Sequence, residues 1–378
     1  MTQQRIPAVF IRGGTSKGVF FHARDLPPER AARDAIFLKA LGSPDAYGRQ
    51  LDGLGGGISS LSKAVVIEPS ARDDADVDYT FAQVVVGEPI VDYSATCGNL
   101  SSAVGPFAVD EGLITAGSGE ALVRVFNTNT SKLFESRFAV ADGRAVTAGD
   151  FALPGVSGTG ARISLDYLDP GGAMTGRLLP TGRATDRIDV PGLGEIEASL
   201  VDASNPVAFV AAADVGKTAG EPPETLEADT AFMARLDAVR RAAGVAMGLG
   251  NRPEDVPLAS PKIAIVAPPL DFEDLSGAAV QAGDMSIAAR MVSMERLHRA
   301  VPLTGAMCLA AACRIDGTIP NQLERNGAAN AEVGVGTPSG VIPVGAKVSR
   351  NGSGDWHAEA CRVFRTQRRL MEGWVLVP

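Results

Sequence analysis

Two stretches of this sequence, AVFIRGGTSKGVFFHARDL at residues 8–26 and ASLVDASNPVAFVAAADV at residues 198–215, follow one plan and decide the fold. Each contains a run of β-forming residues, a short polar loop, a second β-forming run and then a step that contains alanine and aspartate. Two such runs joined by a short turn are typical of a β-hairpin. The sequence therefore predicts that two halves of the chain begin with the same unit.

The similarity continues after these hairpins. A helical stretch follows in each half, at about 28–41 and 224–247. A lysine then opens an apolar strand, in LSKAVVIEP at 61–69 and in SPKIAIVAPP at 260–269. The order and the residue types agree, which indicates a repeat with a period of about 190–210 residues, far longer than that of a solenoid.

A helix of small residues comes next in both halves, CGNLSSAVGPFA at 97–108 and TGAMCLAAACRI at 304–315, and a β pattern resumes after it. We therefore expect two copies of one β-rich domain, each wrapped around a single small-residue helix. The stretch 149–194 is rich in Gly and Pro and contains the expected linker. We place the domains at 1–185 and 186–378, with the last strand free to pack back on the first domain.

Composition excludes several classes of protein. The 378 residues are 45% hydrophobic and 21% charged, as in soluble globular proteins. A net charge of −9 argues against a nucleic-acid binder, and no apolar run reaches the roughly 18–20 residues of a membrane helix. The polar N-terminus lacks the plan of a secretory signal. The densest basic cluster, Arg365, Arg368 and Arg369, is interpreted as a solvated face.

Four scattered cysteines lack the spacing of a disulfide scaffold or of a zinc site, so we expect free thiols in a reducing cytoplasm. One of them, Cys97, precedes Gly98 and Asn99 where the first small-residue helix opens. The positive end of the helix dipole favours a thiolate there, and the free N–H groups of Gly98 and Asn99 can receive a carboxylate. An inert, buried cysteine beside a turn glycine is the alternative interpretation.

Lys63 opens the apolar strand of the first half. Desolvation depresses the pKa of a buried lysine and makes the amine a usable base. A side chain that extends to solvent is the alternative. The preceding loop at 12–18, RGGTSKG, offers glycines and hydroxyls for an anion, or is simply a hairpin turn. It does not satisfy the phosphate-binding pattern GxxxxGK[ST].

The three histidines show no metal-like spacing. His298 precedes the second small-residue helix and is a candidate for contact with substrate, whereas His22 and His357 are expected at the surface. Cys308 and Cys313 lie within the second helix and are interpreted mainly as packing residues.

Longer motifs resemble a known family. They are RIPAVFIRGGTSKGVFF at 5–21, LGSPDAYGRQLDGLGGGISSLSKAVVI at 41–67, CGNLSSAVGPFAVDEGLI at 97–114 and RRLMEGWVLVP at 368–378. These motifs are similar to those of the 2-methylaconitate cis-trans isomerase family, which also includes 4-oxalomesaconate tautomerases and methylitaconate Δ-isomerases. The resemblance runs essentially end to end. It implies the α+β fold of diaminopimelate epimerases, in which two pseudo-symmetric domains each wrap a β-sheet around a central helix and the site lies between them.

The resemblance also implies a set of functional residues. The lysine of SSLSK, Lys63, and the cysteine of CGN, Cys97, would be the catalytic pair, with neither a metal nor an organic cofactor. Asn205, in a Ser-Asn-Pro loop, would contact substrate. The other candidate substrate-binding residues are Thr15, Ser16, Lys17, Ser62, Gly98, Asn99, Leu100, His298, Thr304 and Gly305.

One departure from the epimerase pattern bears on mechanism. Diaminopimelate epimerases carry a second cysteine at the start of the second helix, where this chain has Leu303-Thr304-Gly305. Two-thiol racemase or epimerase chemistry is therefore disfavoured, and Lys63 would supply the base. We expect proton transfer next to the C=C bond of a small unsaturated tricarboxylic acid, foremost 2-methylaconitate.

Isomerisation of 4-oxalomesaconate or of methylitaconate is the alternative on the same scaffold, and a non-catalytic carboxylate-binding protein is the alternative from another class. The expected partner is a small polycarboxylate, not a nucleic acid or a membrane. The resemblance also suggests a homodimer.

Overall fold

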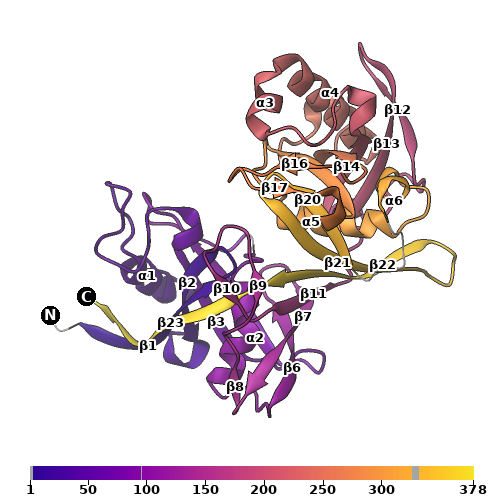
Figure 1. Cartoon of the computed structure of the whole chain (residues 1–378). Coiled ribbons are helices and arrows are strands. Elements are labelled where there is room, and N and C mark those ends of the chain that lie inside the picture. The colour runs from indigo at the N-terminus through magenta and orange to yellow at the C-terminus, as the bar shows by residue number, and fades with distance from the viewer. Residues whose placement is uncertain (1–2, 95, 326–331) are drawn as a thin grey trace. The chain divides into compact units, whose positions relative to one another are not determined.

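The computed structural model describes residues 3–94, 96–325 and 332–378. Contacts divide the chain into two compact units, which we describe separately: the first is Met1–Tyr167 with Phe364–Pro378, and the second is Leu168–Val363 (Figure 1). The division follows Tyr167 rather than residue 185, and the last strand belongs to the first unit.

The first unit is a sheet with two main helices. Its principal elements are β1 (Gln4–Gly13), β2 (Ser16–His22), α1 (Arg30–Leu41), β3 (Lys63–Pro69), β4 (Val77–Val84), β5 (Val91–Asp92), α2 (Ser101–Asp110), β6 (Gly119–Asn127), β7 (Lys132–Ala141), β8 (Arg144–Ala145), β9 (Phe151–Ala152), β10 (Thr159–Gly160), β11 (Ile163–Leu168) and β23 (Gln367–Val377). After the β1–β2 hairpin, β3 runs parallel to β2 and antiparallel to β4, and β6 then runs parallel to β4 and antiparallel to β7.

The second unit repeats this order. Its principal elements are β12 (Asp186–Val190), β13 (Gly194–Ala203), β14 (Asn205–Ala211), α3 (Pro223–Ala228), α4 (Thr230–Ala246), β15 (Lys262–Ala267), β16 (Phe272–Glu273), β17 (Ala279–Val280), β18 (Ile287–Ser293), β19 (Arg296–Leu297), α5 (Leu303–Cys313), α6 (Ile319–Leu323), β20 (Glu332–Thr337), β21 (Gly340–Arg350) and β22 (Trp356–Arg365). After the β13–β14 hairpin, β15 runs parallel to β14 and antiparallel to β18, and β20 then runs parallel to β18 and antiparallel to β21. The predicted duplicated α+β domain is confirmed.

The register of the two sheets agrees as well as their order. Val19 lies opposite Ala64 between β2 and β3, and Ala208 lies opposite Ile263 between β14 and β15. Each hairpin leads into a 3-10 turn, which begins four residues after Val19 and four residues after Ala208. Lys63 and Lys262 therefore open equivalent strands at the same position.

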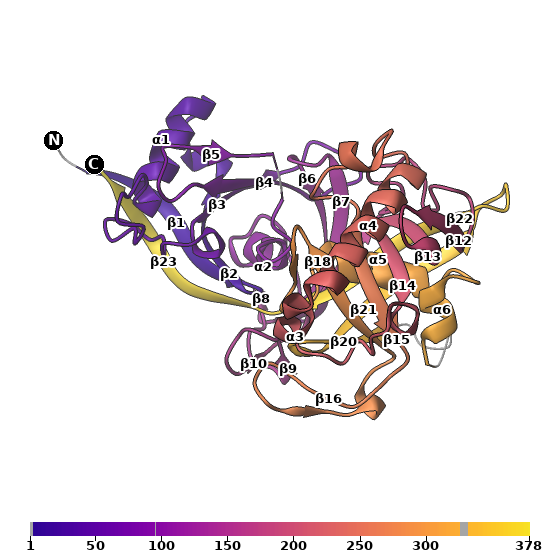
Figure 2. The ribbon, with the colours of Figure 1, turned by 90° about the horizontal axis from the view of Figure 1, so that it is seen from above.

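The two central helices are buried because they are small and apolar all round. Figure 2 shows α2 beside the strands of the first unit, and every residue of α2 except Asp110 is buried. A Cβ on Gly105 would lie 2.6 Å from Ser136 Oγ, so the sheet strand can approach the helix only at a glycine. In α5, all residues from Gly305 to Cys313 are buried.

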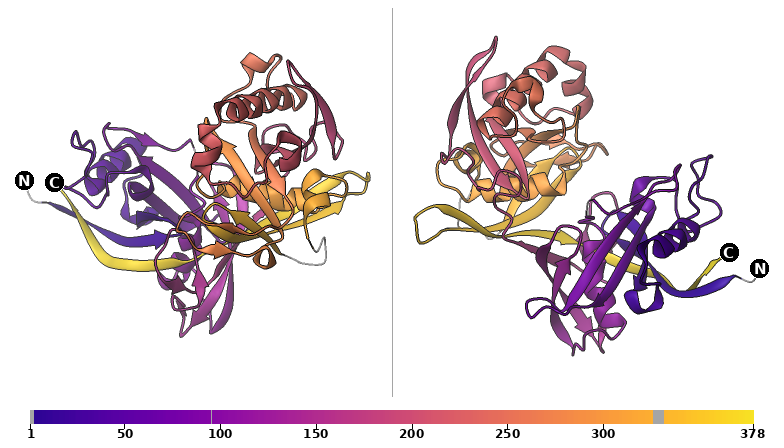
Figure 3. Two further views of the ribbon diagram at one scale, coloured as in Figure 1. Left: turned by 45° about the horizontal axis from the view of Figure 1, so that its top comes forward. Right: turned by 180° about the vertical axis from the view of Figure 1, so that it is seen from behind.

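The chain returns to the first unit at its end. β23 pairs antiparallel with β1 from Gln4 opposite Val377 to Gly13 opposite Gln367 (Figure 3). This pairing brings residues near 365 next to the β1–β2 loop, where the Gly14 N–H donates to the Thr366 carbonyl at 2.9 Å. Within the described residues, no helix combines the length and hydrophobicity that crossing a membrane requires.

Candidate active site

Cys97 lies in the turn that leads into α2. Its carbonyl accepts the Ser101 N–H at 3.0 Å and the Ser101 hydroxyl at 2.9 Å, so the helical hydrogen bonds begin at Cys97. Its sulfur accepts the Leu100 N–H at 3.5 Å, in the position where a capping side chain accepts an orphan donor of a helix. Cys97 itself is 8% exposed.

The N–H groups of Gly98 and Asn99 follow in the same turn. Neither donates a hydrogen bond to another described residue. Free N–H groups at the start of a helix attract anions, because they lie at the positive end of the helix dipole. This turn can therefore bind a carboxylate next to the Cys97 sulfur.

Two glycines let the β1–β2 loop lie against this turn. A Cβ on Gly13 would lie 2.8 Å from the Asn99 carbonyl oxygen, and one on Gly14 would lie 2.3 Å from Asn99 Oδ1. Gly14 also has a φ of +53°, which disfavours other residues. Packing against Asn99 thus explains the two glycines of the RGG motif.

The polar residues of this loop differ in their surroundings. Thr15 is exposed and Ser16 is buried at 3% exposure. The ammonium of Lys17 lies 5.6 Å from the centroid of the Phe10 ring, a cation–π distance.

Lys63 is buried at the first position of β3, with 7% exposure. Its Nζ donates to Gln83 Oε1 at 2.5 Å and lies 4.9 Å from the centroid of the Phe81 ring. Burial lowers the pKa of Lys63, and the electrostatic influence of Cys97 opposes this in part. As a consequence, a larger share of Lys63 is neutral at a given pH than would be the case for an exposed lysine.

Gln83 stands directly opposite Lys63 in the β3–β4 ladder. Its Nε2 donates to the carbonyls of Ser59 at 3.1 Å and Ser62 at 2.9 Å, which fixes the amide with its oxygen toward the lysine. The Ser62 side chain is fully buried and accepts a hydrogen bond from Gln50 Nε2 at 2.7 Å. The Ser62 carbonyl therefore holds the Gln83 amide in place, and that amide accepts the hydrogen bond from Lys63.

The β1–β2 hairpin, the start of β3 and the turn before α2 pack together at Gly18. A Cβ at this position would lie 2.9 Å from the Lys63 carbonyl oxygen and 2.8 Å from Leu100 Cδ1. The β1–β2 hairpin, Lys63 and the turn at 97–100 thus meet within the first unit.

Arg365 is a member of this site that the sequence did not indicate. Its Nε donates to Asn99 Oδ1 at 3.2 Å and its Nη1 donates to the Phe364 carbonyl at 2.8 Å. Burial lowers the pKa of the guanidinium. The expectation that Arg365 belongs to a solvated face is wrong, because β23 returns along β1 and brings the end of β22 next to Asn99.

Two tyrosine side chains are also electrostatic neighbours of Cys97. The hydroxyls of Tyr79 and Tyr167 are buried and lie near the Ser101 side chain, whose hydrogen bonding opposes the rise in their pKa. Burial is the main cause that raises the pKa of both phenols, that of Tyr167 to about 12. Both are therefore neutral O–H donors at physiological pH.

The predicted residues of the second unit lie at the start of β14, just after β19 and at the start of α5. Asn205 opens β14, and its Oδ1 is buried without a hydrogen-bond partner among the described residues. His298 Nδ1 accepts the Ala300 N–H at 3.1 Å. Desolvation and then the charge of Lys262 lower the pKa of His298.

The start of α5 holds Thr304 and Gly305. A Cβ on Gly305 would lie 2.3 Å from Met291 Sδ, so a larger residue there would displace the end of the Met291 side chain. No cysteine stands at this helix start. Cys308 is fully buried, donates to the Val201 carbonyl at 3.3 Å and has a pKa raised by burial, as expected of a packing residue.

His22 corrects another expectation. It is buried at 7% exposure, not at the surface, and its Nε2 lies 3.1 Å from Glu111 Oε2 at the end of α2. Arg369 also pairs with Glu111, at 2.5 Å, and with Glu372. Arg369 is thus engaged in ion pairs within the first unit and is not part of a solvated face.

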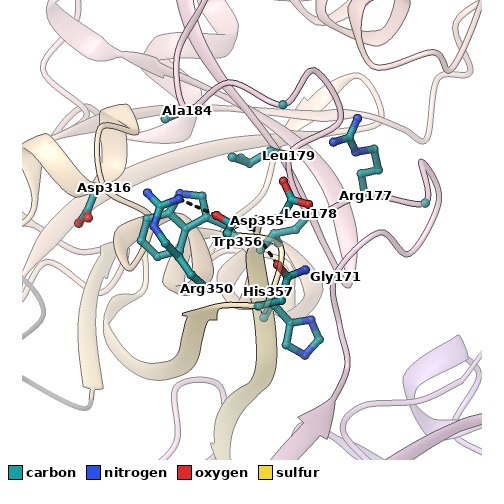
Figure 4. A pocket seen from close by; sticks show the side chains of 15 residues that line it. Gly171, Arg177, Leu178, Leu179, Ala184, Asp316, Arg350, Asp355, Trp356 and His357 are labelled. Carbon is teal, nitrogen blue, oxygen red and sulfur yellow. Dashed lines mark hydrogen bonds between the residues drawn. The ribbon is translucent and has the colours of Figure 1, made fainter.

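A separate pocket of about 480 Å³ lies in the second unit. The guanidinium of Arg350 lies 4.2 Å from the centroid of the Trp356 ring, and Arg177, Asp316 and His357 also line the pocket (Figure 4). None of the residues predicted to bind substrate lines it. In the described ranges, no group of three or more His, Cys, Asp or Glu side chains is arranged to hold a metal ion.

Comparison with known proteins identifies the family. The chain matches the family described as "PrpF protein" over residues 3–378. This chain belongs to the PrpF family. It is 41% identical to the 3-methylitaconate isomerase of Eubacterium barkeri, with 99% of this chain and 98% of that protein aligned. It is 39% identical to the 2-methyl-aconitate isomerase of Cupriavidus necator, over 100% and 98% of the two chains.

A third relative is the 4-oxalomesaconate tautomerase of Pseudomonas putida, 38% identical over 100% of this chain and 97% of that protein. Among solved structures, methylitaconate-delta-isomerase superposes with a TM-score of 0.93 at 40% identity, covering 100% of this chain and 96% of the other. The predicted family, fold and enzyme class are confirmed: this PrpF protein is an isomerase. Identities of 38–41% do not distinguish between the three reactions.

Proposed function

We propose that this PrpF protein isomerises a small unsaturated tricarboxylic acid by moving a proton next to its C=C bond, with 2-methylaconitate as the foremost substrate. Lys63 is the base and Cys97 is the partner acid. The observation that carries the proposal is Lys63 itself, a lysine at the start of a buried strand whose pKa is lowered by burial. A lowered pKa makes the neutral amine easier to form, and the lone pair of that amine can abstract a proton.

The surroundings of Lys63 suit this role. Its neighbour Gln83 is a neutral acceptor, which orients the amine through one hydrogen bond without the charge that would hold it protonated. A carboxylate in the same place would raise the pKa of Lys63 and remove the base. The structure therefore favours proton transfer over simple charge pairing at this position.

The reaction is a balanced proton relay. Lys63 removes the acidic proton of the substrate carbon, and the electron pair spreads through the C=C bond into a carboxylate as a dienolate. Reprotonation at the other end of this system by the Cys97 thiol moves the double bond, whereas bond rotation before reprotonation interconverts cis and trans forms. The free N–H groups of Gly98 and Asn99 and the loop residues Thr15 to Lys17 would stabilise the developing negative charge.

Isomerisation of 4-oxalomesaconate, also a tricarboxylate, or of methylitaconate, a dicarboxylate, is the alternative, since both need the same base and acid. The names of the relatives support all three substrates. The second alternative, a carboxylate-binding protein without activity, does not need a desolvated lysine next to a cysteine. Four residues of the second unit remain candidate substrate contacts in this proposal: Asn205, His298, Thr304 and Gly305.

The test is proton NMR in D₂O with each of the three acids in turn. We expect one acid to be interconverted with incorporation of deuterium at the reprotonated carbon, and Lys63→Ala to reduce the rate by several orders of magnitude. Failure of all three acids to isomerise or to exchange a proton would contradict the proposal.

Cytoplasmic location and a homodimer complete the proposal. Four free thiols support a reducing compartment. Light scattering of the purified protein measures the oligomeric state, and a mass equal to that of one chain of 39.0 kDa would contradict the dimer.

A further inference from the structure

Arg365 has the features of a ligand-binding cation. Its guanidinium is held at two points, by Asn99 through Nε and by the Phe364 carbonyl through Nη1. An arginine has five N–H donors, and Nη2 makes no hydrogen bond with any described residue. A rigid guanidinium with one free edge loses little entropy when it binds a planar carboxylate.

Arg365 also has no acidic partner in the part of the chain that the structure describes. No Asp or Glu of the described residues forms an ion pair with it, and its electrostatic neighbours are Tyr167 and Cys97. Arg369, four residues further along, pairs with two glutamates. A partly buried cation without a counter-ion is costly, and an anionic ligand relieves that cost.

The bond to Asn99 extends the effect of Arg365 to a second donor. Because Asn99 Oδ1 accepts from Arg365 Nε, the Nδ2 group of the same amide is directed away from the arginine. Nδ2 and the Asn99 N–H are then available to the ligand. One anchored side chain thus orients donors that belong to the turn containing Cys97.

We propose that Arg365 binds one carboxylate of the substrate beside Cys97 and thereby selects tricarboxylates over dicarboxylates. This inference rests on the proposed function. Arg365 acts as a specificity residue: it fixes the substrate by a charge-assisted hydrogen bond and does not exchange the reacting proton.

The test measures binding apart from turnover. Propane-1,2,3-tricarboxylate is saturated and cannot isomerise, and glutarate is the matching diacid without the central carboxylate. By calorimetry, the wild-type protein should bind the triacid at least tenfold more tightly than the diacid. In Arg365→Gln we expect the triacid to lose about 10²-fold in affinity and the diacid far less, since a hydrogen bond to a charged partner is worth about 1.5–3 kcal/mol.

Two further variants complete the design. Arg365→Lys keeps the charge but cannot reproduce both the Asn99 bond and a free edge, so it should restore part of the triacid affinity. Arg24→Gln is the matched control, because Arg24 is an exposed cation of the same unit with no ion pair among the described residues; it should bind both acids as the wild type does.

Equal losses for triacid and diacid in Arg365→Gln, or an unchanged ratio, would overturn the inference and leave Arg365 as a support for Asn99. A wild-type protein that binds neither acid would overturn it as well. The proposed function is judged separately by the turnover of Lys63→Ala. If the protein binds the triacid tightly but isomerises none of the acids, the proposed isomerase function is contradicted while the proposed binding role of Arg365 stands.

Discussion

At the scale of the residue, Lys63, the proposed base, has a hydrogen-bond partner that is polar but uncharged. Lys63 is desolvated, and the only side chain that accepts a hydrogen bond from its Nζ within the described part of the chain is the amide of Gln83. Because burial lowers the pKa of Lys63, the neutral amine appears at lower pH than in an exposed lysine. The rate should therefore rise with pH as Lys63 loses its proton, with a midpoint below the ordinary lysine value of about 10.4.

Gln83→Glu tests this dependence. A carboxylate at Oε1 would stabilise the ammonium and raise the pKa of Lys63, so the rising limb of kcat against pH should move up by about one unit or more and the rate at pH 7 should fall at least tenfold. Gln83→Met adds no charge, so the rising limb of kcat against pH should stay at the pH of the wild type or move below it. An identical limb in the wild type and in Gln83→Glu would mean that Lys63 is not the titrating base.

Contacts between single residues also explain which members of the site could be predicted from the sequence. Lys63 and Cys97 stand in local motifs, a lysine before an apolar strand and a cysteine before a helix, so pattern and resemblance nominate both. Gln83 becomes visible only once the β3–β4 register is known. Arg365 is 266 residues from its partner Asn99, and no local pattern encodes that contact. His22 was misread for the same reason, since its partner Glu111 is 89 residues away.

At the scale of the element, the β1–β2 hairpin and the turn before α2 act as one assembly. The hairpin can press on Asn99 only because Gly13 and Gly14 have no side chains. A hairpin is easily read from the sequence, whereas the close approach that explains its glycines requires the packed structure. The proposed role of this loop in binding an anion is supported by its place beside the free N–H groups of the turn.

Gly14→Ala should therefore weaken both the fold and the site. The new Cβ meets Asn99 Oδ1 and the positive φ adds strain, so we expect a loss of about 1–3 kcal/mol in the free energy of unfolding and a raised KM. Gly158→Ala is the matched control in the same unit, with a φ of +79° and open space around the Cβ. Urea unfolding measures the free energy of unfolding of both variants. Equal effects of the two substitutions would show that contact with Asn99 contributes nothing.

At the scale of the whole molecule, the duplicated domain was predictable because order and residue type repeat along the chain. The return of the last strand to the first domain was also anticipated, and β23 pairs with β1, but the position of the division after Tyr167 was not. The repeat is also functionally unequal. Both units open the equivalent strand with a lysine, Lys63 and Lys262, but only the first has a cysteine before its central helix.

This asymmetry fits a single base and a single acid, in contrast to a pair of equivalent thiols. The protein carries a net charge of −9, whereas the charged side chain that contacts Asn99 is a cation, Arg365. An anionic substrate is then recognised by the site and not by the overall field of the molecule.

The measurement that tests the central claim most directly is turnover of Lys63→Ala alongside its affinity for propane-1,2,3-tricarboxylate. We predict that kcat falls by at least about 10³-fold, in the range expected for loss of a general base, while the circular dichroism spectrum is preserved and affinity for the triacid changes less than tenfold. Turnover within tenfold of the wild type would contradict the assignment of Lys63 as the base.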